Sequence, residues 1–550
     1  MRPYPIVMTS SNMDKAPLLE YINCLENCML FSKLMRGIKY IPGFCLSLAL
    51  FLPLWAEGSL PFAKAIIGAV LTFCAFCSLE FSLLHKDEQH EHVNYMIVSV
   101  AFFLILESAF LASLFANYPG LYSTDSVDIV NQALGQSHYS LWHRYEGLSN
   151  HHPVLYTLFV KFFLIVFGYR ESSLAILSFS QSILVALSIS YAALWAYEKT
   201  GRLVLVLSLV IFLAINPIVQ CYAITLWKDV LFGCAFLVYT IHFLRYREGD
   251  WTRKREFLLF IFGLLLSLLR SNGFVVVITS LLIVLVDKYK NGVRIALTGS
   301  LAVWLMITNL IYPFAGISSA HFSETIAMPL QQIGATAASG GYIPDSAKTV
   351  IENVLPLEEF AASYSSGSPN PIKFSERFND EYLESHKSDF LLAWFQVLPY
   401  NIKTYVIAWL NETVGYWMPE ISGYTIASGG PMPADIIPRS FGWALTAEES
   451  ALYVQKYPIA FSLGNIIWFY IALLFVNSYC NEKDTARRKA SDLIPAGALF
   501  LTLLIAAPIA YDFRYLFSLY LTAPFFFIHI TSSEKVAIDK KDGDTSGSKK

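Results

Sequence analysis

Long apolar runs alternate with short polar segments along most of the chain. Most runs approach the roughly 20 residues that an α-helix needs to cross the hydrocarbon core of a bilayer. Thirteen such runs fall at 38–55, 61–84, 94–117, 153–168, 172–197, 203–222, 226–246, 256–270, 273–287, 294–312, 459–478, 493–510 and 515–531. This pattern predicts an all-α polytopic membrane protein with about 12 transmembrane helices.

The composition agrees with lipid as the solvent of this chain. Hydrophobic residues make up 55% of the sequence and charged residues only 15%, whereas soluble domains carry about 25% charged residues. The net charge is −3, and there is no basic stripe of the kind that binds phosphate backbones, so we expect no nucleic-acid partner. The lipid bilayer is the first partner that the sequence predicts.

The positions of Lys and Arg predict how the chain is oriented, because short cytoplasmic loops are enriched in both residues. Basic residues concentrate in the loops 245–255, 287–294 and 481–489. With these loops in the cytoplasm, both termini are also cytoplasmic, and the loop 118–152, the segment 313–458 and the turn 511–514 lie outside. The sequence therefore predicts a multi-pass protein of the plasma membrane.

Termini on the same side require an even number of crossings, and thirteen runs give an odd one. One run must therefore be re-entrant, split or interfacial, and Asn216-Pro217 interrupts the run 203–222. Irregular backbone at membrane depth is tolerated where protein buries it or where it lines a cavity. The expected organisation is a cytoplasmic segment 1–37, a transmembrane module 38–312, a mostly helical extracytoplasmic region 313–458, transmembrane helices 459–531 and a disordered tail 532–550.

Polar residues at predicted helix ends are the candidates for chemistry, because ionisable groups near membrane depth usually face a cavity or a partner. The densest group follows the run 94–117, where Tyr118-Pro119-Gly120 precedes Asp125 and Asp128. Ser123 or Thr124 could cap a short helix that begins here. Composition alone leaves two interpretations of Asp125, a helix-capping residue and a catalytic carboxylate.

Further polar groups lie beside other predicted outer helix ends. Two adjacent His residues end the same loop, and their spacing differs from the i, i+4 spacing typical of metal chelation on a helix. Each group alone has a structural interpretation as an ion pair, a turn or an interface anchor. Together they predict one outer-face site with Asp128, His151, His152, Lys228, Asp229, Arg270, Gln331, Gln332, Arg514 and Tyr515 as binding residues.

The order of these motifs resembles a family of bacterial multi-pass membrane proteins of unknown function. The resemblance covers about residues 94–531 and rests on Tyr-Pro-Gly before Asp125-Ser126, then Asn-His-His-Pro-Val-Leu-Tyr, Trp-Lys-Asp, Arg-Ser-Asn-Gly, Pro-Leu-Gln-Gln and Phe-Arg-Tyr. Those proteins are in turn similar to integral-membrane glycosyltransferases of the GT-C fold, a class that includes protein O-mannosyltransferases and the aminoarabinose transferase of lipid A. The implied fold is therefore GT-C-like.

The resemblance also implies roles for individual residues. Asp125 corresponds to the acidic residue of the first large outer loop, which acts as a base or as a metal-associated carboxylate, and Asp229 to a second outer acid. His152 begins a His-Pro-Val-Leu-Tyr sequence that is similar to the His-Pro-Pro-Leu-Tyr motif of the class. Arg514 corresponds to a late arginine that holds the lipid phosphate. The chain departs from the class in having three helices before the Asp loop and Ser126, not an acid, after Asp125.

The implied reaction moves a sugar from a polyprenyl-phosphate donor to a glycan, lipid or protein acceptor of the cell envelope. It needs a carboxylate to deprotonate the acceptor and cations to stabilise the phosphate, with or without a divalent metal such as Mg²⁺ or Mn²⁺ at Asp125 and Asp229. A transporter or flippase of such a precursor is the main alternative, and it predicts broken helices in matching halves. A non-catalytic protein that binds a partner through 313–458 would leave Asp125, Asp229 and Arg514 dispensable.

Overall fold

The computed structural model describes residues 94–136, 138–140, 143–145, 147–250, 252–286, 291–419, 426–427, 430–457, 461–506 and 512–532. All of them belong to one compact unit, Lys86–Lys550. The runs predicted at 38–55 and 61–84, the N-terminal segment 1–37 and most of the tail 532–550 lie outside the described residues.

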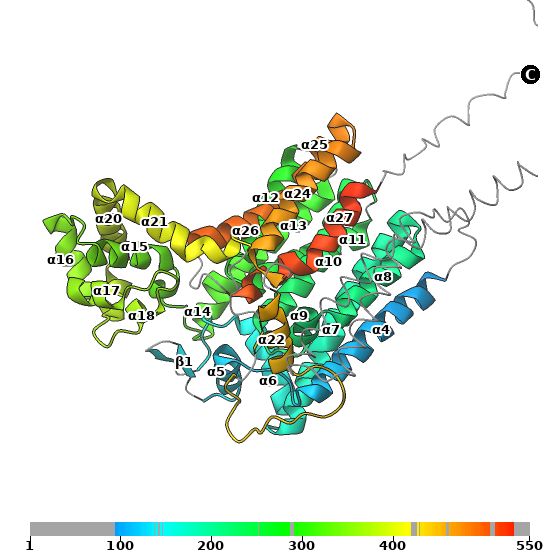
Figure 1. Cartoon of the computed structure of the whole chain (residues 1–550), viewed down its shortest axis with the longest axis horizontal. Coiled ribbons are helices and arrows are strands. Elements are labelled where there is room, and N and C mark those ends of the chain that lie inside the picture. The colour runs from blue at the N-terminus through cyan, green and yellow to red at the C-terminus, as the bar shows by residue number, and fades with distance from the viewer. Residues whose placement is uncertain are drawn as a thin grey trace, which may run out of the picture. The chain divides into compact units, whose positions relative to one another are not determined.

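Within these ranges the protein is a helical membrane protein (Figure 1). Among the described residues, five helical segments are long and apolar enough to cross a bilayer. They are α4 (Tyr95–Ala116), α7 (Glu171–Thr200), α10 (Lys228–Arg247), the continuous segment Asn291–Phe314 and the segment Phe513–Thr531. Asn291–Phe314 comprises α13 (Asn291–Met306), η1 (Ile307–Ile311) and α14 (Tyr312–Phe314), and the last segment comprises η5 (Phe513–Leu516) and α27 (Phe517–Thr531).

A bent pair of helices can supply a sixth crossing. The helix α8 (Leu203–Ile215) meets α9 (Pro217–Ile224) at an angle of 63°. Pro217 has no N–H to continue the helical ladder, and the Asn216 side chain accepts hydrogen bonds from the Ile218 and Val219 N–H groups at 3.0 and 3.3 Å. The prediction that Asn216-Pro217 interrupts the run 203–222 is therefore confirmed.

Shorter helices complete the bundle. These are α6 (Val154–Phe167), α11 (Arg253–Leu269), α12 (Gly273–Val286), α24 (Gly464–Cys480) and α26 (Ile494–Ala506). In the span of α10, 89% of the residues are buried, against 33% in that of α4, which makes α10 a central helix and α4 a peripheral one. Peripheral helices expose apolar side chains, such as Ile165 at 71% and Val286 at 86%. Lipid is the solvent that suits such surfaces.

The region 313–458 is mostly helical where it is described, and it contains a hydrophobic core of its own. Leu330, Ile351, Phe360 and Phe390 are fully buried in this second core. Figure 1 shows its yellow-green helices gathered together. They are α15 (Ala327–Ala338), α16 (Asp345–Val354), α17 (Leu357–Ser363), α18 (Asn370–Lys373), α19 (Asp380–Ser385), α20 (Lys387–Val397) and α21 (Ile402–Thr413), with η2 (Phe322–Glu324), η3 (Leu398–Tyr400) and η4 (Val414–Tyr416).

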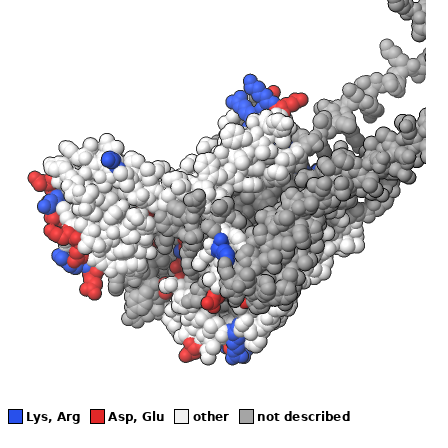
Figure 2. Space-filling view, in the orientation of Figure 1, with Lys and Arg blue, Asp and Glu red and all other residues white. Residues whose placement is uncertain are grey.

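Several smaller elements lie outside the spans. The loop 118–152 contains α5 (Thr124–Ala133) and a hairpin of β1 (His138–Ser140) and β2 (His143–Tyr145), so the chain is not purely helical. The helices α22 (Ala447–Lys456) and α25 (Lys483–Asp492) flank α24. On the face seen in Figure 2, charged side chains gather at α25 and along the outer edge of the α16–α20 region. These charged parts are therefore candidates for contact with water.

Candidate functional site

The segment that carries Asp125 is fixed to the junction between α9 and α10. Leu121 donates its N–H to the Ile224 carbonyl and accepts from the Leu226 N–H, both at 3.0 Å. Gly120 makes this close approach possible, because it has a φ of +130° and a Cβ there would lie 2.1 Å from the Ser178 Oγ. The Tyr-Pro-Gly sequence therefore sets the path of the chain just before Asp125.

Asp125 lies in the first turn of α5, and Ser123 is the N-cap of that helix. The Ser123 N–H donates to the Ser126 Oγ at 3.0 Å, and that hydroxyl donates to the Leu226 carbonyl at 2.8 Å. Capping is thus performed by the two serines, so Asp125 is not required as the N-cap. The structure therefore gives no support to the interpretation of Asp125 as a helix-capping residue.

Arg514 is the centre of the site. Its guanidinium forms an ion pair with Asp125 and a second ion pair with Asp512 at 2.7 Å, and it donates to the Tyr515 hydroxyl at 3.1 Å. It also lies 5.7 Å from the centre of the Trp227 ring, which is within the range of a cation–π contact. One arginine therefore joins α5, the start of α10 and the turn before α27.

A second arginine extends the cluster toward α11. Arg270, the C-cap of α11, forms an ion pair at 2.9 Å with Asp229 in the first turn of α10. Its guanidinium lies 4.9 Å from the centre of the Tyr515 ring, the same distance that separates this ring from the Arg514 guanidinium. We call Asp125, Asp229, Arg270, Asp512, Arg514 and Tyr515 the charge cluster.

Lys228 and His152 lie near this cluster. Lys228 interacts electrostatically with Asp125 and Asp229. The fully buried His152 also interacts electrostatically with Asp125. His151 stacks edge-on against His152 at 4.7 Å, and Asp128 follows one helical turn after Asp125 on α5. The structure thus gathers most of the predicted site residues around Arg514.

The two glutamines do not join the charge cluster. Gln331 donates to the Ser365 carbonyl at 2.7 Å, and Gln332 donates to the Tyr405 carbonyl at 3.1 Å. Both side chains hold α15 within the second core, because buried amides need hydrogen-bond partners wherever they lie. Their predicted role in the same site as Arg514 is not supported by their contacts.

The two carboxyls on Arg514 have different acidities. Burial raises the pKa of Asp125, but the Arg514 guanidinium and the neighbouring His152 and Lys228 outweigh it and hold that pKa well below its usual range. Burial dominates at Asp512 and raises its pKa to about 6, although Arg514 opposes the change. Asp125 is consequently ionised at neutral pH, and Asp512 is the weaker acid.

Asp512 pairs with Arg514 although only two positions separate them in the sequence. Residues two apart within a helix do not face each other, but this pair is not within one helix. Asp512 is the N-cap of the 3₁₀-helix η5 and lies outside the helix, and its side chain also accepts the Arg514 N–H at 3.1 Å. The signal was available, because an Asp directly before a helix start is a capping residue by preference.

The surroundings of Asp125 and Asp229 suit a bound phosphate better than a metal ion. Each carboxylate already has a guanidinium partner, and Lys228 lies near both. A divalent cation between them would be repelled by three cationic side chains. Guanidinium groups are the preferred bidentate partners of phosphate oxygens.

A second buried ionic group lies at the other end of α10. Arg247 forms an ion pair with Asp492 at 2.6 Å, and His529 lies 3.0 Å from both Asp492 and Glu248. The 20 residues of α10 correspond to about 30 Å of helix, which is the thickness of the hydrocarbon core. The charge cluster and this Arg247 group therefore lie one bilayer thickness apart along α10. The basic segments at 245–248 and 483–492 meet at this second end, where Arg488 donates to the Arg247 carbonyl at 2.6 Å.

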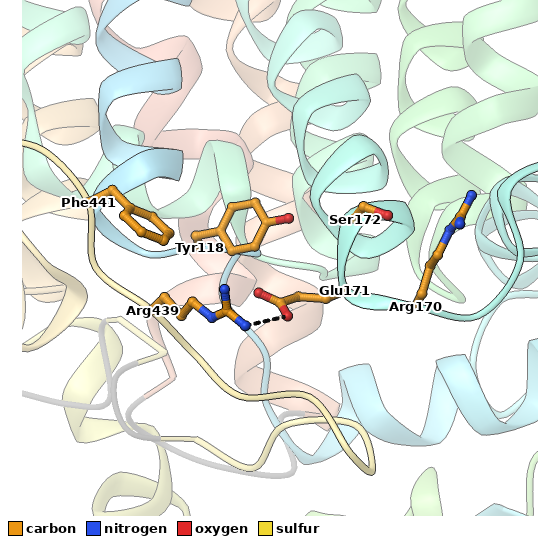
Figure 3. A pocket seen from close by; sticks show the side chains of 6 residues that line it. All are labelled: Tyr118, Arg170, Glu171, Ser172, Arg439 and Phe441. Carbon is orange, nitrogen blue, oxygen red and sulfur yellow. Dashed lines mark hydrogen bonds and ion pairs between the residues drawn. The ribbon is translucent and has the colours of Figure 1, made fainter.

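A pocket of about 410 Å³ opens beside the start of α7. Figure 3 shows Arg439 directed toward Glu171, to which it donates at 3.4 Å, and the Tyr118 ring above this pair. Arg170 points away from them. None of the six lining residues belongs to the charge cluster, so the pocket is a separate feature.

The fold and the site define a class, a helical membrane bundle with a buried cluster of ion pairs at one end. Residues 109–544 match DUF6020, a family of unknown function, and the chain belongs to that family. The match contains every member of the charge cluster. No curated protein and no solved structure matches the chain.

Proposed function

We propose that the chain is a GT-C-like membrane glycosyltransferase, which moves a sugar from a polyprenyl-phosphate donor to a cell-envelope acceptor. The observation that carries this proposal is the meeting of Asp125 and Asp512 on Arg514. A phosphate-binding fork and an ionised carboxylate are thereby held together at one end of an apolar bundle. This end is the extracytoplasmic one in our proposal, because the basic segments gather at the opposite end.

The reaction needs a place where a lipid-soluble donor meets a water-soluble acceptor. In our proposal the polyprenyl tail lies along the exposed apolar helices while the phosphate binds Arg514 and Arg270. The bond from the sugar C1 to the phosphate oxygen breaks, and a bond from C1 to the acceptor oxygen forms. Asp125 takes the acceptor proton, and polyprenyl phosphate leaves with its charge stabilised by the two guanidinium groups.

Arg514 is already paired before any substrate binds, and this has a mechanistic consequence. A phosphate that takes two of its N–H donors displaces the Asp125 carboxylate from the guanidinium. The pKa of Asp125, which that guanidinium depresses, then rises toward its usual value, and the carboxylate becomes a stronger base. Donor binding would thus activate the base in the same step.

The test compares Asp125→Asn with Asp128→Asn, its matched control on the same helix, in cells that lack the native gene. Mass spectrometry of the envelope glycans and of the lipid-linked sugars measures the transfer. Loss of a general base costs about 10²–10⁴-fold in rate, so Asp125→Asn should abolish the glycan product while its lipid-linked donor accumulates. Arg514 keeps Asp512 as a partner in this variant, so the protein should still insert and fold. Equal product from both variants would contradict the proposal.

Transport of a lipid-linked precursor is a second candidate, and the break between α8 and α9 favours it. Broken helices often surround the substrate site of transporters, and α9 ends beside the segment that leads to Asp125. Detergent-solubilised membranes distinguish the two candidates, because they contain no compartments. If the chain is an enzyme, sugar transfer continues in the solubilised membranes and Asp125→Asn abolishes it. If the chain is a transporter, another protein performs the transfer, and Asp125→Asn leaves the transfer rate unchanged.

A further inference from the structure

Three metal-ligating side chains meet in the region of the second core. His321 lies directly before η2, and Asp380 and Glu384 lie on α19. One potential ligand atom from each residue lies within 4.8 Å of the other two. Among the residues that the structure describes, this is the one such group of three or more His, Cys, Asp and Glu side chains.

The backbone places these groups as a chelate. Residues four apart on a helix share one face, so Asp380 and Glu384 both point toward His321. Asp380 is only 5% exposed in its side chain, and its Oδ2 lies 2.5 Å from the His321 Nδ1. The nearly buried Asp380 carboxylate thus lies beside the His321 ring nitrogen, and Glu384 provides the third potential ligand.

We propose that His321, Asp380 and Glu384 bind a divalent cation of the zinc class. One imidazole with two carboxylates is a donor set that suits Zn²⁺, which accepts nitrogen and oxygen ligands at about 2.0–2.2 Å. A tetrahedral ion with such bonds separates its ligand atoms by about 3.4 Å. The three atoms already lie within 4.8 Å of one another, so binding requires the His321 and Asp380 atoms to move apart from their present 2.5 Å. The ion replaces the hydrogen bond between His321 and Asp380, and solvent completes the coordination.

The contacts already present around Glu384 are compatible with this ion. Glu384 accepts the Phe322 N–H at 2.8 Å, which orients the carboxylate as a second-shell hydrogen bond does in metal sites. It also pairs with Lys387, whose side chain is 46% exposed. An exposed lysine can move into water when a cation binds, so this ion pair does not block the site.

The site is connected to the loop that precedes α6. Ser318, three residues before His321, donates to the Leu148 carbonyl at 3.2 Å and accepts the Asn150 N–H at 2.8 Å. That loop ends at His152, which interacts electrostatically with Asp125. A cation at His321 would therefore fix the segment 318–321 between α19 and this loop. This inference is independent of the proposed glycosyl transfer.

The experiment uses the full chain, purified in detergent and stripped of metal with a chelator. Titration with Zn²⁺ by calorimetry, together with elemental analysis, measures affinity and stoichiometry. We expect one Zn²⁺ per chain and a higher thermal unfolding midpoint, and at least about tenfold weaker binding for His321→Ala and Glu384→Gln. Mg²⁺ at the same concentration should not compete, because its preference is for oxygen ligands and water.

Two matched control variants test whether any loss of Zn²⁺ binding is specific to the proposed ligands. His386 stacks on Tyr382 at 4.0 Å, and Glu381 is exposed on the same helix α19, so His386→Ala and Glu381→Gln should bind Zn²⁺ like the original chain. If His321→Ala fails to fold, Glu384→Gln alone decides the comparison, since it preserves size and removes only the charge. Absent Zn²⁺ binding, equal binding by Glu384→Gln, equal loss in the controls, or equal competition by Mg²⁺ would each overturn the proposal.

Discussion

Replacement of Arg514 by Lys tests the phosphate-binding role most directly. The substitution keeps one positive charge but removes the planar fork, so Lys can no longer hold Asp512 and a phosphate with separate N–H groups at fixed angles. In the structure the Arg514 side chain is only 11% exposed, and its guanidinium contacts Asp125, Asp512 and Tyr515. The variant therefore changes hydrogen-bond geometry more than local charge.

The expected magnitude follows from the contact that is lost. One hydrogen bond to a charged group contributes about 1.5–3 kcal/mol, and each 1.4 kcal/mol corresponds to about tenfold in Kd. Arg514→Lys should accordingly bind polyprenyl phosphate about 10- to 100-fold more weakly than the original chain. The loss should vanish for the corresponding polyprenol, which has the same tail without a phosphate.

The assay is a titration of the detergent-purified chain with a short-chain polyprenyl phosphate, followed by native mass spectrometry. Arg247→Lys is the matched control, because Arg247 is also buried and ion-paired, with Asp492, but at the opposite end of α10. Unchanged affinity for polyprenyl phosphate in Arg514→Lys would refute the reasoning. An equal loss in Arg247→Lys, or an equal loss for polyprenol, would attribute the effect to general destabilisation.

Two further predictions concern the region of the second core. If the region 313–458 is extracytoplasmic, a cysteine in place of the exposed Ser366 should react with a membrane-impermeant thiol reagent in intact cells. Reaction only after lysis would place this region in the cytoplasm. Burial raises the pKa of Glu412 to about 8, although Lys373 opposes the shift. Because this folded-state pKa exceeds the usual 4.5, the stabilising contribution of the neutral carboxyl is complete below pH 4.5 and lost as the pH rises through 8. Glu412→Gln should flatten the fall of Tm over that window, and parallel Tm curves would contradict this pKa.

The membrane helices could be predicted from the sequence because apolar length is a direct physical requirement of the bilayer. The run 94–117 corresponds to Tyr95–Ala116, and the break in 203–222 was visible because proline cannot donate a hydrogen bond. Several other runs became helices of 13–17 residues. Hydropathy alone does not fix where such a helix begins, because polar end residues can be included or excluded at little cost.

The members of the candidate site could be predicted, but their pairing could not. Asp125 and Arg514 stood out because each follows or precedes a long apolar run, yet 389 residues separate them in the sequence. Gln331 and Gln332 also lie in a polar motif that the sequence placed at the outer face, but their side chains bind within the second core. Position beside a helix end predicts that a polar side chain has a partner, whereas the identity of that partner depends on tertiary packing.

The balance of charge explains why Asp125, and not another carboxylate, would yield to a phosphate. Three aspartates face two arginines and Lys228, so the cluster is close to neutral without a ligand, as burial requires. A phosphate must therefore displace an anion instead of adding to the cluster. The Asp125 side chain is 31% exposed, against 1% for Asp229 and 6% for Asp512. Only Asp125 can move toward water without leaving a buried charge unpaired, and the same exposure makes it accessible to an acceptor.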